Sequence, residues 1–430
     1  MKIAIVGSGI SGLAVAHALQ GHAELTLYEA GHYFGGHTHT VDVTLPTAHG
    51  PTTWGVDTGF LVFNERTYPN LIRLFGELGI ATAKTDMSFS VQAGEAGRRL
   101  EWNGASLNSV FAQRRNLFNW RFLGMLREVL HFNRLATALA ESEADARLAQ
   151  PLGQWLDEQR FSREFRDWYF LPMMACIWSC PTAQMLEFPV ATMIRFCHNH
   201  GLIQVSGRPQ WWTVTGGARR YVDKIVARIP DKRLNTPVRA IERDERGVLI
   251  TTDQGAQRFD QVVLATHSDQ ALALLRQPST EETRVLGAIR YQPNRAVLHT
   301  DASVLPERRL AWAAWNYERA TATDQESSRV CLHYLLNQLQ PLPFEQPVVV
   351  SLNPLREIAP QHVLGDYEYA HPVFDLGAIS AQKALPDLQG RQHTWYAGAW
   401  TGYGFHEDGL KSGLSVARQL LTQLAQREAA

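Results

Sequence analysis

The sequence has few cysteines, no excess of charge of either sign and no long apolar run, and each shortage excludes a class of protein. Its 430 residues contain four cysteines, none of them in a C-x-x-C pair. Neither a disulfide framework nor the usual spacing of a zinc site is present, so we expect no metal and a reducing, cytoplasmic setting. The formal net charge of −1 gives no electrostatic case for nucleic-acid binding.

A membrane span and a chain of linked separate modules are also not expected. No stretch of about 18 uninterrupted apolar residues occurs, which is roughly the length that a spanning helix needs. The apolar residues within 1–20 follow a strand-turn-helix pattern, so we do not expect them to be a signal peptide. No proline-rich linker or internal repeat divides the chain. Because its length exceeds one ordinary core, we expect two domains in close contact, between which the chain crosses several times.

The most informative feature is a glycine-rich turn near the N-terminus. Residues 2–6 form an apolar run that predicts a buried strand, and a G-x-G-x-x-G pattern follows and opens an Ala/Leu-rich helix. Such glycines permit a tight turn, let backbone N–H groups approach a pyrophosphate and let the helix pack on the strand. The next predicted strand ends in an acid that can bind a ribose. The residues expected to contact this dinucleotide are Gly7, Gly9, Ile10, Ser11, Gly12, Glu29 and Ala30.

A second glycine pair indicates which dinucleotide is bound. Gly35 and Gly36 precede His37 and Thr38. A close backbone approach at this point suits the diphosphate and ribityl chain of FAD, whereas domains that bind only NAD have no consistent need for it. This stretch resembles the FAD-binding opening of the amine oxidase, protoporphyrinogen oxidase and phytoene desaturase superfamily, which usually has Arg at the position of His37. We expect the FAD to be non-covalent, because no cysteine lies near the C-terminal motif.

Further segments extend this resemblance over the whole chain. Residues 54–60 resemble the superfamily's D-x-G segment, in which the backbone lies along the flavin ring. Residues 234–266 resemble the ribbon that contacts adenine and the strand that closes the nucleotide-binding sheet. Residues 395–413 resemble the closing motif, in which a glycine opens the final helix and the helix start faces the flavin. By this resemblance, the further cofactor contacts are Thr58, Gly59, Val238, Ala265, Gly398, Ala399, Gly409 and Leu410.

The resemblance implies an α/β fold, with a Rossmann-type, doubly wound FAD-binding domain and an interleaved α+β substrate domain. Residues 234–241 and 248–252 alternate as a half-exposed antiparallel ribbon does, and 259–266 form the continuous apolar run of a buried parallel strand. The FAD-binding domain is expected over 1–80, 205–270 and 390–430, and the substrate-binding domain over 81–204 and 271–389.

A narrower resemblance indicates the substrate. Residues 291–301, 314–317, 352–354, 369–372 and 404–409 together resemble a bacterial branch of flavoproteins often encoded beside cyclopropane-fatty-acyl-phospholipid synthase-like methyltransferases. Members have been linked to desaturation of methyl-branched fatty acyl chains. The resemblance implies an FAD-dependent oxidoreductase that passes a hydride from a lipid-like acyl chain to flavin N5, with a lipid methyltransferase as a partner. Two alternatives stay open: a flavin amine oxidase-like enzyme for another small substrate, and a flavoprotein that serves the methyltransferase without turnover of its own.

Two residues are expected at the reacting end of the flavin. His406 aligns with one of the two aromatic cage positions of amine oxidases, and the other position falls within residues 369–374. A histidine there can act as a general base, polarise a bound group or only hydrogen-bond a neighbour. Arg295 aligns with the superfamily's lysine near flavin N5. Because a guanidinium cannot act as a base at neutral pH, Arg295 would hold an anion, stabilise reduced flavin or lie on the surface.

Residues 111–135 are basic and apolar at helical spacing, with five arginines and one acid, Glu128. Two interpretations stay open. In the first, a helix roofs the substrate cavity with its apolar face while its arginines face water. In the second, a basic amphipathic surface docks on anionic lipid, which would place the protein peripherally at the inner face of a membrane.

Overall fold

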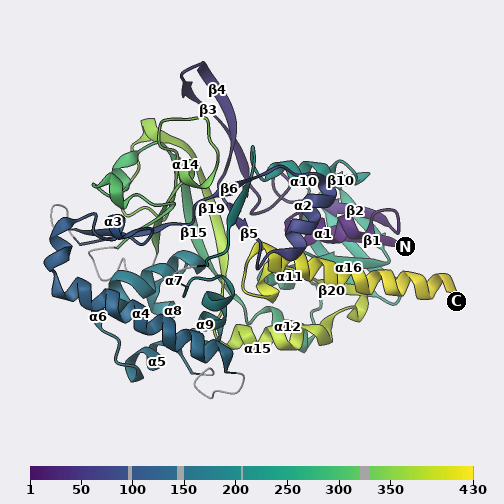
Figure 1. The fold of residues 1–430 in the computed structure, drawn as a ribbon. Coiled ribbons are helices and arrows are strands. Elements are labelled where there is room, and N and C mark those ends of the chain that lie inside the picture. Colours follow the sequence, from purple (N-terminus) through teal and green to yellow (C-terminus); the bar gives the residue numbers. More distant parts are fainter. Residues whose placement is uncertain (95–98, 143–149, 205–206, 320–329, 430) are drawn as a thin grey trace.

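The structure, a computed structural model, describes residues 1–94, 99–142, 150–204, 207–319 and 330–429. Figure 1 shows two lobes side by side. One lobe holds both termini, and the other holds a twisted sheet above a layer of helices. The fold is α/β as expected, with a parallel sheet in the first lobe and a mixed sheet in the second.

Five parallel strands form the sheet of the first lobe, in the order β10-β2-β1-β14-β20. They are β1 (Lys2–Val6), β2 (Glu24–Tyr28), β10 (Asp231–Arg233), β14 (Gln261–Leu264) and β20 (Thr394–Tyr396). Stretches 1–80, 205–270 and 390–430 thus contribute strands to one sheet. Ile3, Ala4 and Ile5 of β1 are fully buried because the sheet is covered on both faces, which explains why this strand reads as an uninterrupted apolar run.

Helices cover one face of the parallel sheet. These are α1 (Ile10–Leu19), α2 (Pro69–Leu78), α10 (Arg219–Val226) and α16 (His406–Ala429), which share a core with Ile3 and Ile5. Gly409 of α16 packs on α1, where a Cβ would lie 2.8 Å from the Ile10 side chain. The expectation that a glycine opens this helix is therefore wrong for Gly409. The helix begins at His406, and Gly409 serves the close packing of two helices.

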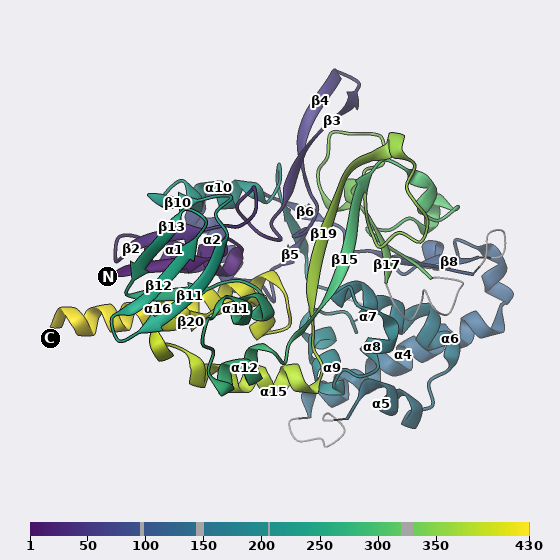
Figure 2. The same cartoon turned by 180° about the vertical axis from the view of Figure 1, so that it is seen from behind.

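The other face carries the antiparallel ribbon β11 (Val238–Asp244), β12 (Gly247–Thr252) and β13 (Gly255–Phe259), which confirms the expected ribbon. Three helices share its core with Ala4 and Val6 of β1. They are α11 (Ser268–Leu274), α12 (Thr280–Leu286) and α15 (Leu376–Ala384). The helices α12 and α15 come from the stretch 271–389 assigned to the substrate domain, yet their buried apolar faces pack on the nucleotide-binding lobe (Figure 2).

Seven strands form the sheet of the second lobe, in the order β19-β15-β18-β17-β16-β7-β8. Neighbours are antiparallel except β16 and β7, which are parallel. The strands are β7 (Phe89–Ala93), β8 (Leu100–Asn103), β15 (Arg290–His299), β16 (Trp315–Glu318), β17 (Cys331–Leu335), β18 (Val349–Leu352) and β19 (Val363–Val373). Because side chains alternate along a strand, Trp315 and Tyr334 face one way and Asn316 and His333 the other.

Helices from residues 107–199 form the layer beside this sheet. They are α3 (Leu107–Val110), α4 (Trp120–Glu141), α5 (Leu152–Glu158), α6 (Arg163–Phe165), α7 (Leu171–Trp178), α8 (Thr182–Met185) and α9 (Val190–Asn199). The helix expected within 111–135 starts only at Trp120, after a 3₁₀ turn η1 (Arg114–Phe118), because the Asn119 side chain caps it. Within the described residues, no helix is both long enough and apolar enough to cross a bilayer.

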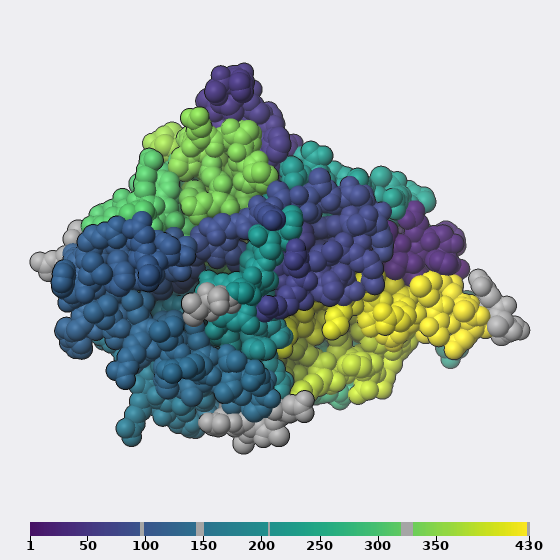
Figure 3. Space-filling view, in the orientation of Figure 1, coloured from purple at the N-terminus to yellow at the C-terminus, as the bar shows by residue number. Residues whose placement is uncertain are grey.

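Smaller elements connect the lobes. The hairpin of β3 (Thr40–Thr47) and β4 (Gly50–Asp57) projects from the molecule (Figures 1 and 3). A three-stranded sheet has the order β5-β9-β6. Its strands and the short helix α14 are β5 (Phe63–Asn64), β6 (Thr82–Thr85), β9 (Trp211–Val214) and α14 (Leu336–Leu339).

Candidate active site

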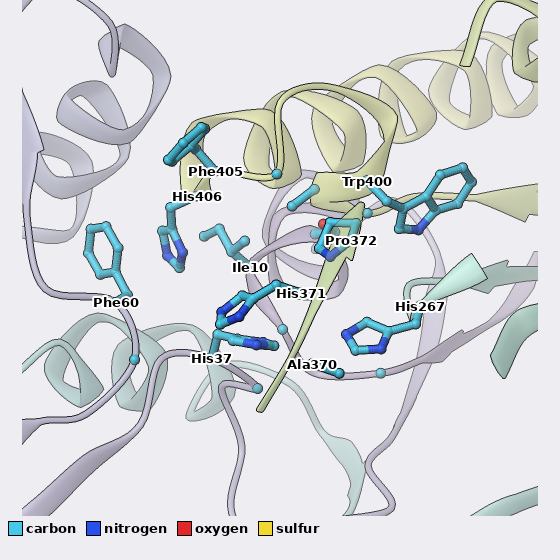
Figure 4. Close-up of a pocket in the computed structure, with 18 of the residues that line it drawn as sticks. Ile10, His37, Phe60, His267, Ala370, His371, Pro372, Trp400, Phe405 and His406 are labelled. Carbon is cyan, nitrogen blue, oxygen red and sulfur yellow. The ribbon is translucent and has the colours of Figure 1, made fainter. Parts of the chain in front are cut away.

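A cavity of about 720 Å³ lies where the two lobes meet. Its walls come from the glycine turn, from residues 35–37 and 59–62, from the start of α16, and from β16, β17 and β19 of the mixed sheet. Figure 4 shows part of it, with side chains of both lobes facing the same space. The cavity therefore joins the expected dinucleotide site to the expected substrate site.

The glycine turn forms one end of the cavity. Gly7 has φ +101°, and a Cβ there would lie 2.6 Å from the Ala265 carbonyl oxygen, so no other residue fits. A Cβ on Gly12 would collide with the Gly7 carbonyl, so Gly12 allows the helix to pack on the strand rather than lining the cavity. Gly9 lines the cavity, and a Cβ on it would meet no protein atom within 4 Å. The open space beside the Gly9 backbone is the cradle that a diphosphate needs.

The acid expected to bind a ribose, Glu29, and the second glycine pair lie beside this turn. The Glu29 carboxylate accepts hydrogen bonds from the backbone N–H groups of Ser8 (3.0 Å) and Gly31 (2.8 Å) and lines the cavity. Gly35 and Gly36 both have positive φ, and a Cβ on Gly36 would lie 3.1 Å from the Gly9 Cα. The two glycine segments thus meet back to back, as a cofactor with a long diphosphate and ribityl chain requires.

Most of the other predicted cofactor contacts also line this cavity. They are Ile10, Ser11, Ala30, His37, Gly59, Val238, Ala265, Gly398 and Ala399. Thr38, Thr58 and Leu410 lie behind its wall. The Thr38 hydroxyl is 2.5 Å from the Tyr221 hydroxyl, and Thr58 is 2.7 Å from the Tyr369 hydroxyl, so both position neighbouring side chains.

Four histidines from separate segments of the chain face the cavity (Figure 4). The rings of His37 and His371 are 5.4 Å apart, and those of His37 and His267 are 6.1 Å apart. Burial lowers the pKa of His37 to about 3, of His371 to about 4 and of His406 to about 3, and it also lowers the pKa of His267. All four rings are therefore neutral at pH 7. The His37 Nε2 atom has no hydrogen-bond partner among the described residues, and a bound ligand can supply one.

His406, the first residue of α16, is held by two contacts. Its ring stacks on Phe60, with centroids 3.9 Å apart and an interplanar angle of 14°. Its Nε2 atom is 2.7 Å from the Tyr221 hydroxyl. The imidazole is thus fixed in place at the cavity wall, uncharged and hydrogen-bonded to a phenol.

The far end of the cavity is apolar and aromatic. Its lining there includes Met87, Ile177, Phe196, Leu202, Trp211, Trp315 and Tyr334. The His200 ring stacks on Phe196, and burial lowers the pKa of His200 to about 4, so this histidine is neutral as well. Among the described residues that line the cavity, Glu29 alone has a charged side chain, and it belongs to the glycine end. A ligand at the far end meets neutral side chains.

The expectation that Arg295 lies at the flavin is wrong. Its guanidinium bonds Asp366 (2.7 Å) and Glu357 (3.1 Å), and its side chain is 39% exposed. Arg295 does not line the cavity. Its neighbour Asn294 faces the other side of β15 and donates to His371 Nδ1 at 2.9 Å. Strand alternation accounts for the difference, because Arg295 points away from the face on which His371 lies.

Several cavity residues were not predicted from the sequence. His267, Tyr291 and Phe60 were not named as site residues, although Phe60 ends the segment 54–60 and Tyr291 begins the segment 291–301. The fold brings all three to the cavity wall, where the rings of His267 and Tyr291 stack 4.3 Å apart. His371 does lie in the segment 369–374, which was expected to supply a cage position. The presence of a histidine in that segment as well as at position 406 was the sequence feature that could have indicated His371.

A second group of buried polar residues lies on the reverse face of the mixed sheet. Glu318, Cys331 and His333 place ligand-type atoms within 4.8 Å of one another. His333 Nε2 is 3.1 Å from the Glu318 carboxylate, which also pairs with Arg99 at 3.1 Å. The guanidinium and the imidazole account for this buried carboxylate without a cation.

The class defined by this fold and cavity is that of FAD-dependent oxidoreductases, and comparison with known proteins agrees. The family described as flavin containing amine oxidoreductase matches residues 10–421. The chain therefore belongs to this family, and FAD is its cofactor. A curated Mycobacterium tuberculosis protein, the flavin-containing monoamine oxidase candidate AofH, is 27% identical over 277 residues. That alignment covers 62% of this chain and 56% of AofH, so the chain spans about half the length of this relative.

Solved structures share the fold over nearly the whole chain. Cyclohexylamine oxidase from Brevibacterium oxydans has a TM-score of 0.67 and 18% identity, with 99% of each chain covered. The fatty acid isomerase of P. acnes that produces CLA has a TM-score of 0.66 and 15% identity, with 97% of this chain and 98% of that chain covered. At these identities the likeness shows the fold.

Proposed function

We propose that the protein desaturates a methyl-branched, unsaturated fatty acyl chain. The observation that carries this proposal is the far end of the cavity, where apolar and aromatic side chains and neutral histidines leave no charge for a charged substrate to pair with. A long hydrocarbon chain gains free energy by leaving water for such a lining. The fold accommodates fatty acids in the P. acnes isomerase, which supports the same class of substrate.

The side chains at the cavity wall suit this chemistry. FAD, when bound, supplies the acceptor of a hydride and is reoxidised by oxygen or another acceptor. Loss of a hydride leaves positive charge on the acyl chain, and a neighbouring C–H then becomes acidic enough for a weak base. Neutral His406 serves as that base: its Nε2–H donates to the Tyr221 hydroxyl and holds the ring in place, so the lone pair of Nδ1 takes the proton. The apolar lining excludes water, which would otherwise capture the positive charge.

An amine oxidase-like activity on another small substrate is the alternative, since several structural relatives act on amines. The cavity lining argues against it, because His406 aligns with one aromatic cage position of the superfamily's amine oxidases, and the segment 369–374, expected to supply the other, presents His371 to the cavity. The neutral lining also offers no carboxylate for an ammonium group.

The test is conversion of a defined lipid. Holoenzyme is incubated in air with a phospholipid that carries a methyl-branched monounsaturated chain, and in parallel with the free acid. We expect mass spectrometry to find an acyl product two hydrogens lighter, and a matched straight-chain lipid to react more slowly. Unchanged acyl chains in both presentations would overturn the proposal. Lipids extracted from cells with and without the protein provide the same comparison in vivo.

A lipid methyltransferase in the cytoplasm belongs to this proposal as a partner, because methyl transfer to an unsaturated chain would supply the substrate. Co-purification of the two proteins, with lipid conversion by the flavoprotein alone, is the expected result. Co-purification without any conversion or flavin reduction by the flavoprotein would instead assign it an accessory role.

A further inference from the structure

Exposed apolar side chains and arginines gather on the outer edge of the substrate lobe. Of the ten large apolar residues exposed in the described part of the chain, six lie within residues 107–130. Phe118 is 90% exposed, Leu107 80% and Trp120 79%. Figure 1 places α3 and α4 on the side of the molecule opposite the chain termini, and Figure 2 shows the same for α4. The docking surface, as we call this set, comprises Leu107, Leu117, Phe118, Trp120, Leu123 and Leu130 with Arg114, Arg115, Arg121 and Arg127.

This surface is separate from the apolar face that α4 buries. Phe122, Met125 and Phe132 of α4 are fully buried in the core of the substrate lobe. Leu123, Arg127 and Leu130 follow at spacings of four and three residues, so they share the outer side of the same helix. The helix thus has a second apolar stripe that the core does not use, and arginines interrupt it.

The most exposed aromatic residues are held in place by a capped helix start. The Asn119 side chain accepts hydrogen bonds from the backbone N–H groups of Arg121 and Phe122 and caps α4 between Phe118 and Trp120. The neighbouring α3 has a capping box between Ser106 and Ser109, next to exposed Leu107. Side chains on such ordered turns lose little backbone entropy when a partner covers them.

The charge of the surface is positive. Arg114 bonds the Asn108 side chain and the Phe111 carbonyl, and Arg115 bonds the Arg99 carbonyl. Within the described residues these two guanidinium groups have no carboxylate partner, whereas Arg121 pairs with Glu164. Two arginines beside Phe118 therefore keep their charge available to an anion.

We propose that the docking surface binds the protein to an anionic lipid bilayer. Tryptophan, phenylalanine and leucine enter the boundary between headgroups and acyl chains, and arginines bind lipid phosphates with paired N–H groups. Charge complementarity favours this occupant over a second copy of the chain, because two copies would bring the same arginines together. The proposal is independent of the acyl substrate, since it concerns binding and not turnover.

The test is co-sedimentation of the holoenzyme with vesicles of phosphatidylcholine alone or of phosphatidylcholine with phosphatidylglycerol. We expect binding to the anionic vesicles that weakens as salt is raised. Phe118→Ser with Trp120→Ser should lower the bound fraction about tenfold or more at equal lipid, because the inserted apolar groups are lost. Arg114→Gln with Arg115→Gln should weaken binding and flatten its salt dependence.

The control variants replace residues of the same types elsewhere on the surface. Leu364→Ser with Leu376→Ser removes two other exposed apolar side chains, and Arg239→Gln with Arg258→Gln removes two other surface arginines. Both controls should bind vesicles as the wild type does. Absence of wild-type binding to anionic vesicles, or unchanged binding of the Phe118/Trp120 variant, would overturn the proposal. So would a wild-type dimer in light scattering that this variant converts to a monomer, since the occupant would then be a second copy. Lipid conversion in detergent is measured on the same variants. A variant that fails to bind vesicles but still converts the lipid fully has lost membrane binding and not the proposed enzymatic function.

Discussion

The two ends of the cavity are built in different ways. The glycine end is built around backbone from residues 7–36, in which Gly7, Gly9 and Gly36 allow chain segments to approach closely and leave the space that we assign to a diphosphate. The far end consists of side chains from segments distant in sequence, such as His371 of β19 and His406 of α16. A diphosphate needs the same close backbone approach in every dinucleotide-binding protein. Its site therefore has a short sequence pattern that can be recognised before the structure is known. A substrate pocket is specific to one kind of molecule, and its side chains come together only when the chain folds.

Replacement of Gly9 by valine should break the glycine end most severely. A Cβ at this position meets no protein atom within 4 Å, so a side chain has room there and extends into the space assigned to the diphosphate. We expect FAD binding to weaken by about 100-fold or more, the factor that a loss of about 3 kcal/mol produces. Flavin content after gel filtration and a fluorescence titration with FAD measure this.

Gly76→Val in α2 is the matched control, because a Cβ there also meets no atom within 4 Å. It should keep the full flavin content. Retention of wild-type FAD affinity by Gly9→Val would contradict the assignment of this turn to the diphosphate.

Replacement of His406 by glutamine should break the far end and leave the glycine end intact. Loss of the positioned base should slow reduction of the flavin by the lipid about 10²-fold or more, with unchanged flavin content. Anaerobic stopped-flow mixing measures the rate. Tyr221→Phe, which removes the hydroxyl that contacts His406 Nε2 and the Thr38 hydroxyl but keeps the imidazole, should have a smaller effect, and the surface variant His49→Gln none. Equal rates in His406→Gln and the wild type would remove His406 from the mechanism.

The neutral histidines of the far end should also make the protein less stable in acid. The pKa of His371 is about 4 in the folded chain against 6.5 in the unfolded chain, so the unfolded chain binds a proton that the folded chain does not. The free energy of unfolding is therefore highest above pH 6.5 and falls toward pH 4, by up to about 1.4 kcal/mol per pH unit for each such histidine. His371→Gln should reduce this slope in urea unfolding. A steeper or unchanged slope in His371→Gln would show that its ring is not buried neutral.

Replacement of Arg295 by glutamine should have the smallest effect. The guanidinium pairs with Asp366 and Glu357 at the surface and not with the cavity, so flavin content and reduction rate should equal those of the wild type. Stability in urea should fall by no more than about 1 kcal/mol, as is usual for exposed ion pairs. A large loss of activity in this variant would return Arg295 to the reacting end.

The sequence predicted the parts of the fold that depend on local chain geometry. The strand, turn and helix at residues 2–19, the antiparallel ribbon and the buried strand at 261–264 were all found where expected. The parts that depend on tertiary contacts were not predicted. Alignment with the superfamily predicted that Arg295 lies at the flavin. Because side chains alternate along β15, Asn294 faces His371 and Arg295 faces the opposite side of the strand. The grouping of His37, His267 and His371 needs three distant segments, and no local pattern encodes it.

We propose that the far end of the cavity receives an uncharged acyl chain. The most direct measurement is anaerobic mixing of the holoenzyme with a methyl-branched monounsaturated phospholipid, and separately with cyclohexylamine and putrescine, while the visible absorbance of the flavin is followed. We expect the lipid to bleach the flavin and neither amine to do so. Bleaching by an amine, with no response to the lipid in any presentation, would contradict it.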